Sequence, residues 1–176
     1  MADQRSITLD EFNQMSAADA REVVTRCCGA RRWVEQVAAR RPVAAFDDVL
    51  VAADEAFATL EPRDWLEAFA HHPKIGDVDA LRAKFASAAD WASGEQAGVS
   101  MARETTLAAL AEGNRAYEQK FGYIFIVYAT GKSADEMLES LEKRLPNDPE
   151  EELGVAATEQ MKITHLRLHK LLDQGI

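Results

Sequence analysis

Cysteine is scarce in this sequence: there are two, and they are adjacent, at Cys27 and Cys28. The stretch around them has a helical pattern, and neighbouring residues on a helix point in directions ~100° apart. That geometry does not suit a disulfide or a zinc knuckle. We therefore expect two buried packing residues and, as the simplest setting, a reducing cytoplasm.

Long apolar runs are also missing. The longest one, Tyr123 to Ala129, is far shorter than the ~20 residues that cross a bilayer. The N-terminal residues, Met1 to Asp10, are polar and lack the basic-then-apolar order of a secretory signal. These observations predict no association with a membrane and support a cytoplasmic location.

Positive charge is in deficit, with 20 Lys and Arg residues against 30 Asp and Glu residues and a net charge of -10. Binding to nucleic acid needs a basic face for the phosphates, so this class of partner is excluded. An anionic membrane surface is disfavoured for the same reason. A small anionic substrate stays possible, because a few local basic side chains can reverse the field inside a pocket.

The remaining composition is that of an ordinary globular protein, with 47% hydrophobic and 28% charged residues in a chain of 176. Single domains usually have about 100–200 residues. Internal repeats, low-complexity tracts and long linkers are absent from the sequence. We therefore expect one domain over residues 1–176.

Glycine and proline lie mostly between helical patterns. Thr8 with Glu11 and Ser133 with Glu136 have the form of capping boxes, which mark helix starts. Gly29 is expected to end the helix that starts after Ser16, since glycine often follows a helix. The pattern predicts a single all-α domain of about seven to eight helices.

The second half of the chain contains the longest predicted helices. One covers Met101 to Lys120, with Gly122 as its left-handed stop, and the last begins at Pro149. Its apolar stripe is formed by Leu153, Ala157, Met161, Thr164, Leu168 and Leu171. Tyr123 to Tyr128 is rich in β-forming residues but has no partner, so we expect an extended stretch or a helix start.

A first candidate for chemistry is His72, which lies at a predicted helix end because Pro73 disfavours helical geometry before it. A histidine titrates near neutral pH and can act as an acid or a base. The alternative is an exposed loop histidine with no role. Metal binding is not predicted, because the His71–His72 pair and the His165/His169 pair lack further ligands at suitable spacing.

A second candidate is Glu95 with Gln96, near a predicted helix start. Free N–H groups there stabilise a carboxylate, so Glu95 can be a simple capping residue. The Gln96 amide both donates and accepts hydrogen bonds. Together the two side chains suit a urea-like or amide-rich ligand.

A third candidate is Arg167, which borders the apolar stripe of the last helix. A guanidinium in that place needs an anionic partner, because burying it unpaired is costly. Two alternatives stay open. Its partner is either an internal carboxylate or the carboxylate of a substrate, held by a bidentate pair.

Taken in order, these pieces resemble the family of 2-oxo-4-hydroxy-4-carboxy-5-ureidoimidazoline (OHCU) decarboxylases, which act in urate degradation. The resemblance extends from Leu9 to Leu172 and depends on the order and spacing of short motifs. The matching residues are His72-Pro73, Ile75-Gly76, Glu95-Gln96-Ala97-Gly98, Asn114, Tyr117-Glu118, Phe121-Gly122-Tyr123, Phe125-Ile126, Gly131-Lys132, Glu136, Arg144-Leu145, Asn147, Glu159, Ile163 and Arg167-Leu168.

The resemblance implies an all-helical, usually homodimeric and cofactor-free enzyme that converts OHCU to (S)-allantoin and carbon dioxide. It implies three catalytic residues: His72, which would transfer a proton, Glu95, which would orient the ureido or ring N–H groups, and Arg167, which would hold anionic or carbonyl oxygens. The roles of His72 and Glu95 could be exchanged. The other positions that it implies for substrate binding are Pro73, Ser93, Gln96, Val127, Tyr128, Ala129 and Gly131.

The chain departs from the family pattern at two positions. Ala92 stands where the family commonly has serine, with Ser93 one step later, and Lys132 stands where arginine is frequent. Two other functions therefore stay open: a non-catalytic helical interaction module, and a lyase or hydrolase acting on a related ureide. The resemblance also suggests a functional association with a 5-hydroxyisourate hydrolase.

Overall fold

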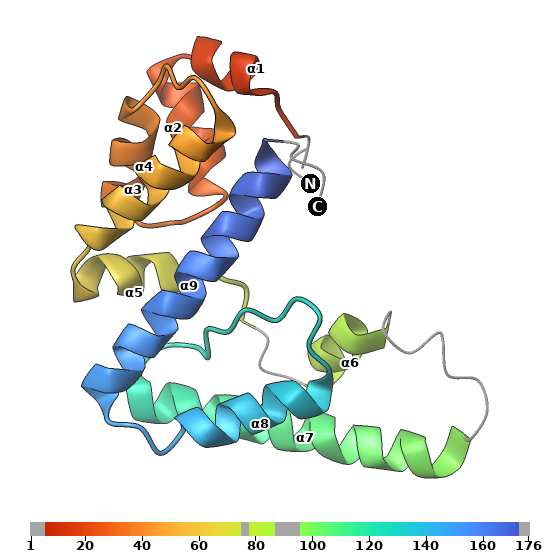
Figure 1. Cartoon of the computed structure of the whole chain (residues 1–176). Helices are drawn as coiled ribbons and strands as arrows, with labels where there is room; N and C mark the ends of the chain where they lie inside the picture. Colours follow the sequence, from red (N-terminus) through yellow and green to blue (C-terminus); the bar gives the residue numbers. More distant parts are fainter. Residues whose placement is uncertain (1–5, 75–77, 87–95, 173–176) are drawn as a thin grey trace. The chain divides into compact units, whose positions relative to one another are not determined.

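The computed structural model describes residues 6–74, 78–86 and 96–172; at Lys84, Ala86 and residues 96–103 it describes the backbone alone. Within these residues every regular element is an α-helix, nine in all, and no β-strand occurs (Figure 1). The all-α class is confirmed, with nine helices in the described part of the chain where about seven to eight were expected.

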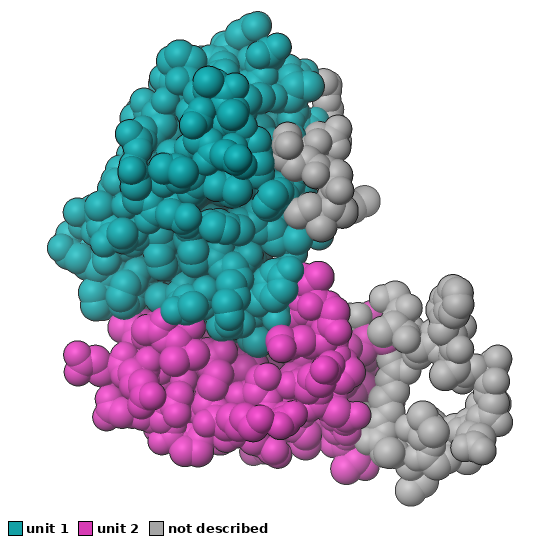
Figure 2. All heavy atoms as spheres, in the orientation of Figure 1, with its two compact units in different colours: residues 1–72, 126–128, 156–176 teal, residues 73–125, 129–155 magenta. Residues whose placement is uncertain are grey.

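The chain divides into two compact units, which Figure 2 shows in different colours. Unit 1 consists of residues 1–72, 126–128 and 156–176, and unit 2 of residues 73–125 and 129–155. The last helix therefore contributes its first turns to unit 2 and the rest of its length to unit 1. The expectation of one domain over residues 1–176 stays a prediction.

Unit 1 contains five short helices and most of the last one. They are α1 (Leu9–Gln14), α2 (Ala17–Thr25), α3 (Arg31–Ala39), α4 (Phe46–Ala58), α5 (Pro62–Ala70) and the later part of α9 (Pro149–Leu171). Its core is built from buried apolar side chains, which include Phe12, Val24, Trp33, Val37, Val49, Phe69, Ile126 and Leu168. The indole N–H of Trp33 donates to the Ala53 carbonyl at 3.0 Å, which satisfies its polar atom in this core.

Unit 2 contains α6 (Val78–Ala86), α7 (Gln96–Phe121), α8 (Ala134–Arg144) and the start of α9. Helices α7 and α8 pack closely at Gly113, where a Cβ atom would lie 2.3 Å from Cδ2 of Leu141. A larger residue at this position would have to displace the end of the Leu141 side chain. Leu107, Leu110, Tyr117 and Leu141 are buried between these helices and their neighbours.

Several helix boundaries follow from local signals as predicted. The capping boxes at Thr8 and Ser133 are formed, and Pro149 opens α9. Gly122 adopts a φ of 79° directly after α7, the left-handed conformation expected of a glycine that ends a helix. Helix α7 begins at Gln96, five residues before the predicted start at Met101.

The prediction for Gly29 was wrong. Helix α2 ends at Thr25, and the two cysteines lie in the turn that follows it rather than on a helix. Gly29 is required for space: a Cβ atom there would lie 2.1 Å from the ring of His71. This contact joins segments far apart in the sequence, so no local pattern could indicate it.

The segment between α7 and α8 is neither helix nor strand at residues 124–129, so a helix start, one of the two conformations expected of Tyr123 to Tyr128, does not occur there. Within it Ile126 is buried. The described helices include none that is long and apolar enough to cross a membrane.

Candidate active site

His72 follows the C-terminus of α5, the position that its proline neighbour predicted. Pro62 occupies the first turn of α5, and His71 is its C-cap residue. The Nδ1 atom of His71 lies 3.0 Å from the Glu67 carbonyl, one turn back. The end of α5 is therefore held in place immediately before His72.

The His72 side chain is half-buried and has a partner on a distant helix. Its Nε2 atom lies 2.7 Å from Oε1 of Gln160 on α9. Burial lowers the pKa of His72, and the positive charge of Arg167 lowers it further, while the hydrogen bond to Gln160 acts in the opposite direction. The imidazole is therefore neutral at pH 7 and is available as a base.

Arg167 comes from the same helix, two turns after Gln160. Its Nη1 atom donates to the Cys27 carbonyl at 3.3 Å. Within the described residues no carboxylate lies at ion-pair distance from Arg167, so the alternative of an internal acidic partner has no support there. Most donors of this part-buried guanidinium can therefore serve an anionic ligand.

The two cysteines border this cluster without being reactive. Both are buried and unpaired. Burial raises the pKa of Cys27 to about 12 and that of Cys28 to about 11, against opposing effects that include the charge of Arg167. Both thiols are protonated at neutral pH, which confirms the prediction that they are packing residues.

Gln160 and Thr164 are functional candidates that the sequence analysis missed. Both side chains are fully buried on one face of α9, and Gln160 is the residue that contacts His72. The available signal was a pair of polar residues four positions apart on an otherwise apolar helix face. Thr164 was placed on the expected stripe, but the buried row runs through Ala156, Gln160, Thr164 and Leu168, whereas Met161 is partly exposed.

Residues 126–128, the part of the segment between α7 and α8 that belongs to unit 1, are attached to α9 through their backbone. The N–H of Tyr128 donates to Oε2 of Glu159 at 2.7 Å, and Lys162 pairs with the other oxygen at 2.5 Å. Val127 and Tyr128, both predicted substrate contacts, thus belong to the same unit as His72 and Arg167. The Tyr128 N–H is already engaged, so a substrate contact at Tyr128 would use other atoms.

The remaining predicted site residues divide into two groups. Pro73, Ala129 and Gly131 belong to unit 2, with Gly131 at a φ of 77°. Ser93 and Glu95 lie outside the described residues, and Gln96 is described only as the first residue of α7. The structure therefore brings together His72 and Arg167 of the three predicted catalytic residues.

The other histidines of α9 have structural partners. Nε2 of His165 lies 2.8 Å from Oδ1 of Asp54, and the ring of His169 packs against Phe46 with centroids 4.6 Å apart. Among the described residues no group of three His, Cys, Asp or Glu side chains could hold a metal ion.

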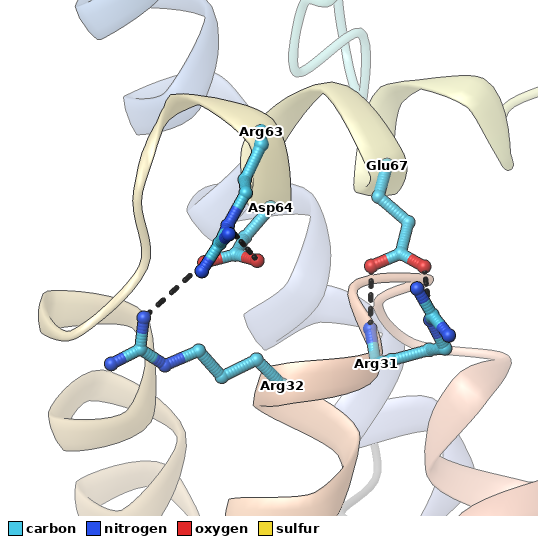
Figure 3. Close-up of a pocket in the computed structure, with 5 residues that line it drawn as sticks. All are labelled: Arg31, Arg32, Arg63, Asp64 and Glu67. Carbon is cyan, nitrogen blue, oxygen red and sulfur yellow. Dashed lines mark hydrogen bonds and ion pairs between the residues drawn. The ribbon is translucent and has the colours of Figure 1, made fainter.

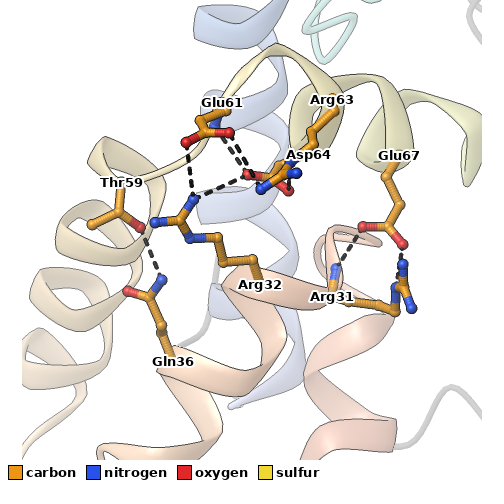
Figure 4. Close-up of polar contacts among 8 residues, drawn as sticks. All are labelled: Arg31, Arg32, Gln36, Thr59, Glu61, Arg63, Asp64 and Glu67. Atoms are coloured by element: carbon orange, nitrogen blue, oxygen red, sulfur yellow. Dashed lines mark hydrogen bonds and ion pairs between the residues drawn. The ribbon is translucent and has the colours of Figure 1, made fainter.

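A cavity of about 580 Å³ in unit 1, away from His72, was not predicted. Its lining residues come from the starts of α3 and α5: Arg31, Arg32, Arg63, Asp64 and Glu67 (Figure 3). Each arginine faces a carboxylate: Arg31 pairs with Glu67 at 2.6 Å, and Arg32 and Arg63 share Asp64 and Glu61 at 3.3–3.8 Å (Figure 4). The lining itself has three arginines and two carboxylates, and the neighbouring Glu61 brings the acidic partners to three, so each arginine side chain already has an acidic partner.

The cluster around His72 has a different chemical character. A neutral imidazole lies within the field of a guanidinium that has no acidic partner among the described residues. The guanidinium suits a carboxylate, and the imidazole can transfer a proton to or from the molecule that the guanidinium holds. An acid that gains or loses a proton during its reaction fits both groups.

Comparisons with known proteins show the family to which this chain belongs. A sequence profile of the OHCU decarboxylase family matches residues 13–169. The uric acid degradation bifunctional protein TTL of Arabidopsis thaliana is 38% identical over 147 residues, which are 84% of this chain and 45% of that protein. The corresponding bifunctional protein of Bacillus sp. (strain TB-90) is 25% identical over 170 residues, 95% of this chain and 32% of its own. The chain thus spans less than half the length of these two relatives.

A solved structure is similar as well. The crystal structure of an OHCU decarboxylase in the presence of (S)-allantoin has a TM-score of 0.67 and 33% sequence identity to this chain. The match covers 85% of this chain and 96% of that one.

Proposed function

This chain belongs to the OHCU decarboxylase family, and from that membership we propose that it catalyses the decarboxylation of OHCU to (S)-allantoin and carbon dioxide. The observation that carries the proposal is that His72 and Arg167 belong to one cluster in unit 1, close enough for the Arg167 charge to lower the pKa of His72. One is a neutral proton acceptor and the other a cation with no acidic partner among the described residues.

The proposed reaction breaks the bond between the ring carbon and its carboxylate. Carbon dioxide leaves, and the electron pair moves into the conjugated imine of the ring, so the substrate supplies its own electron sink. The adjacent hydroxyl loses its proton and becomes a carbonyl. One proton adds to the ring nitrogen that received the electron pair and another to the carbon that bears the ureido group, so that one of the two comes from the hydroxyl and the other from water. Delivery of the proton to one face of that carbon yields the (S) product.

Three requirements follow for the protein. It holds the carboxylate out of the ring plane, stabilises the charge that develops on the ring, and transfers the proton. We assign proton transfer to His72 and the binding of anionic or carbonyl oxygens to Arg167. Glu95 would orient the ureido N–H groups. The proposed binding positions are Pro73, Ser93, Gln96, Val127, Tyr128, Ala129 and Gly131.

A stereochemical assay tests this function. OHCU is generated in the cuvette from urate by oxidation and hydrolysis of 5-hydroxyisourate, and the handedness of allantoin is followed by circular dichroism. Rapid formation of (S)-allantoin is expected. Slow, racemic product at the uncatalysed rate would contradict the proposal and favour the interaction module or an enzyme for a related ureide.

The assembly and the setting are part of the same proposal. We propose a cytoplasmic homodimer that works beside a 5-hydroxyisourate hydrolase. The bifunctional names of two relatives, which this chain matches only in part, support the association with a second enzyme. Sedimentation equilibrium should give twice the chain mass of 19.5 kDa. A monomer at micromolar concentration would contradict the dimer, and a co-sedimentation experiment with the hydrolase tests the association.

A further inference from the structure

Gln160 and Thr164 are the buried polar side chains nearest to the chemistry in unit 1. Both have no solvent exposure. Burying an amide and a hydroxyl is costly unless their donors and acceptors are hydrogen-bonded. The hydrogen-bond partners of these two side chains therefore show which atom of Thr164 faces Gln160 and which atom of Gln160 faces His72.

The hydroxyl of Thr164 determines how the Gln160 amide is turned. Its single proton is donated to the Gln160 backbone carbonyl at 2.9 Å, one helical turn back. Its oxygen is then an acceptor at the 3.2 Å contact with the side-chain amide of Gln160, so Nε2 of that amide faces Thr164. The amide oxygen is left to face His72.

An amide oxygen accepts hydrogen bonds and cannot donate one. The 2.7 Å contact between Oε1 of Gln160 and Nε2 of His72 therefore requires the proton to be on the imidazole nitrogen. A neutral imidazole has one N–H and one lone pair. The lone pair must then be on Nδ1.

We propose that Gln160, oriented by Thr164, is a positioning residue that holds His72 as its Nε2–H tautomer and makes Nδ1 the atom that exchanges protons with the substrate. This deepens the proposed function and rests on it. When Nδ1 takes a proton, the Nε2–H bond to Gln160 is kept, so the ring does not turn. The same proton then leaves from Nδ1.

The charged groups that act on His72 agree with this assignment. Arg167 on α9 and His71 on the preceding position both oppose protonation of the ring. The Gln160 oxygen alone favours the protonated form. Removing this oxygen should therefore make the ring harder to protonate as well as freeing its tautomer.

The first experiment reads the tautomer in the free protein. Long-range ¹H–¹⁵N correlation spectra at pH 7.5 should show Nε2 of His72 as the protonated nitrogen and Nδ1 as the unprotonated one. The chain has four histidines, and His72→Asn identifies the resonance by its loss. Protonation at Nδ1 in the wild-type protein would overturn the proposal, whatever the enzyme's activity.

Variants then separate positioning from folding. Gln160→Met keeps the volume but removes the acceptor, and should shift His72 toward a tautomer mixture and lower kcat about 10- to 100-fold with KM little changed. Thr164→Val removes the hydroxyl that orients the Gln160 amide, and should also give a tautomer mixture and a lower kcat. Thr164→Ser keeps a hydroxyl at this position and should have the wild-type spectrum and rate. Gln36→Met is the matched control, since Gln36 donates to Thr59 at 2.8 Å elsewhere in the same unit (Figure 4).

The two readouts distinguish failure of this inference from failure of the proposed function. If the wild-type protein converts OHCU but Gln160→Met keeps both its tautomer and its kcat, the positioning role is wrong and the function stands. If the wild-type protein shows no conversion, the function is wrong, and the spectra still decide the tautomer. Thermal melts of each variant show whether the fold is kept.

Discussion

Each compact unit contains a cluster of buried polar side chains, and the two clusters differ in what their groups bind. In unit 2 the buried carboxylate of Glu152 accepts hydrogen bonds from the Tyr117 hydroxyl, from Arg144 at 2.6 and 2.8 Å, and from Asn147 at 2.8 Å. The Arg144 guanidinium also lies over the ring of Phe125, 4.6 Å from its centroid. The charges of this cluster are matched within it.

The cluster of unit 1, formed by Gln160, Thr164, His72 and Arg167, has a cation that no described carboxylate neutralises. Gln160 and Thr164 satisfy one another, but the chain of hydrogen bonds ends on His72. Arg167 donates to a backbone carbonyl and, within the described residues, to no carboxylate. A cluster that matches its own charges holds helices together, whereas one with unmatched donors is suited to a ligand.

The largest effect is expected on activity from His72→Asn. Asparagine cannot take up a proton, so loss of general acid–base catalysis should lower kcat about 100- to 10,000-fold. The melting temperature should change little, because His72 is only half-buried. Allantoin formation is measured by circular dichroism, with His165→Asn as the control, since His165 pairs with Asp54. Near wild-type turnover would show that His72 does not transfer the proton.

The next largest effect is expected on stability from Glu152→Ala. The change leaves the nearly buried Arg144 without its partner and should cost about 3–5 kcal/mol of unfolding free energy. Urea titration measures it. Glu150→Ala removes an exposed carboxylate from the same helix and should change stability by less than about 0.5 kcal/mol. Equal decreases in unfolding free energy in the two variants would show that the hydrogen bonds of Glu152 do not stabilise unit 2.

A smaller effect is expected on the titration of His72 when Arg167 is replaced by methionine. Burial and the Arg167 charge hold the pKa of His72 below its ordinary value of about 6.5, and removing the charge should raise it. Because the unfolded chain binds this proton more readily, the stability contributed by neutral His72 is present above pH ~6.5 and is lost as the pH falls toward the folded-state pKa. NMR titration of the ring measures the shift. Arg21→Met is the control and should leave the pKa of His72 unchanged. An unchanged pKa of His72 in Arg167→Met would show that the Arg167 charge does not act on this ring.

The smallest effect is expected in the arginine-lined cavity. Arg63 is 77% exposed and pairs with Glu61 and Asp64 at 3.3 and 3.8 Å, so Arg63→Ala should cost less than about 0.5 kcal/mol. Steady-state kinetics with OHCU should be unchanged. A large loss of kcat/KM in this variant would indicate that the substrate binds in the arginine-lined cavity and would contradict its assignment to the cluster around His72.

Local signals predicted much of the fold. Thr8, Ser133 and Pro149 mark helix starts through hydrogen bonds or ring geometry that involve residues within one turn, and each was placed correctly. Gly122 was assigned correctly for the same reason. Gly29 was not, since its constraint comes from the ring of His71, more than forty residues later.

The candidate site was predictable in part. The order of short motifs identified the family and, through it, His72 and Arg167. Gln160 and Thr164 were missed because each looks ordinary on its own helix and acquires a role only from its partner. The roles of Glu95, Ser93 and Gln96 stay predictions, as their side chains lie outside the described residues.

By itself the sequence determined the helical class, several helix boundaries and the family, because these depend on neighbours along the chain and on the order of motifs. It also determined the deficit of positive charge, from which we predict no nucleic-acid partner. Only the tertiary structure decided which polar groups are matched. Glu152 is enclosed by its own donors, whereas Arg167 is not paired with a described carboxylate, and that difference depends on distances between helices that no local pattern encodes.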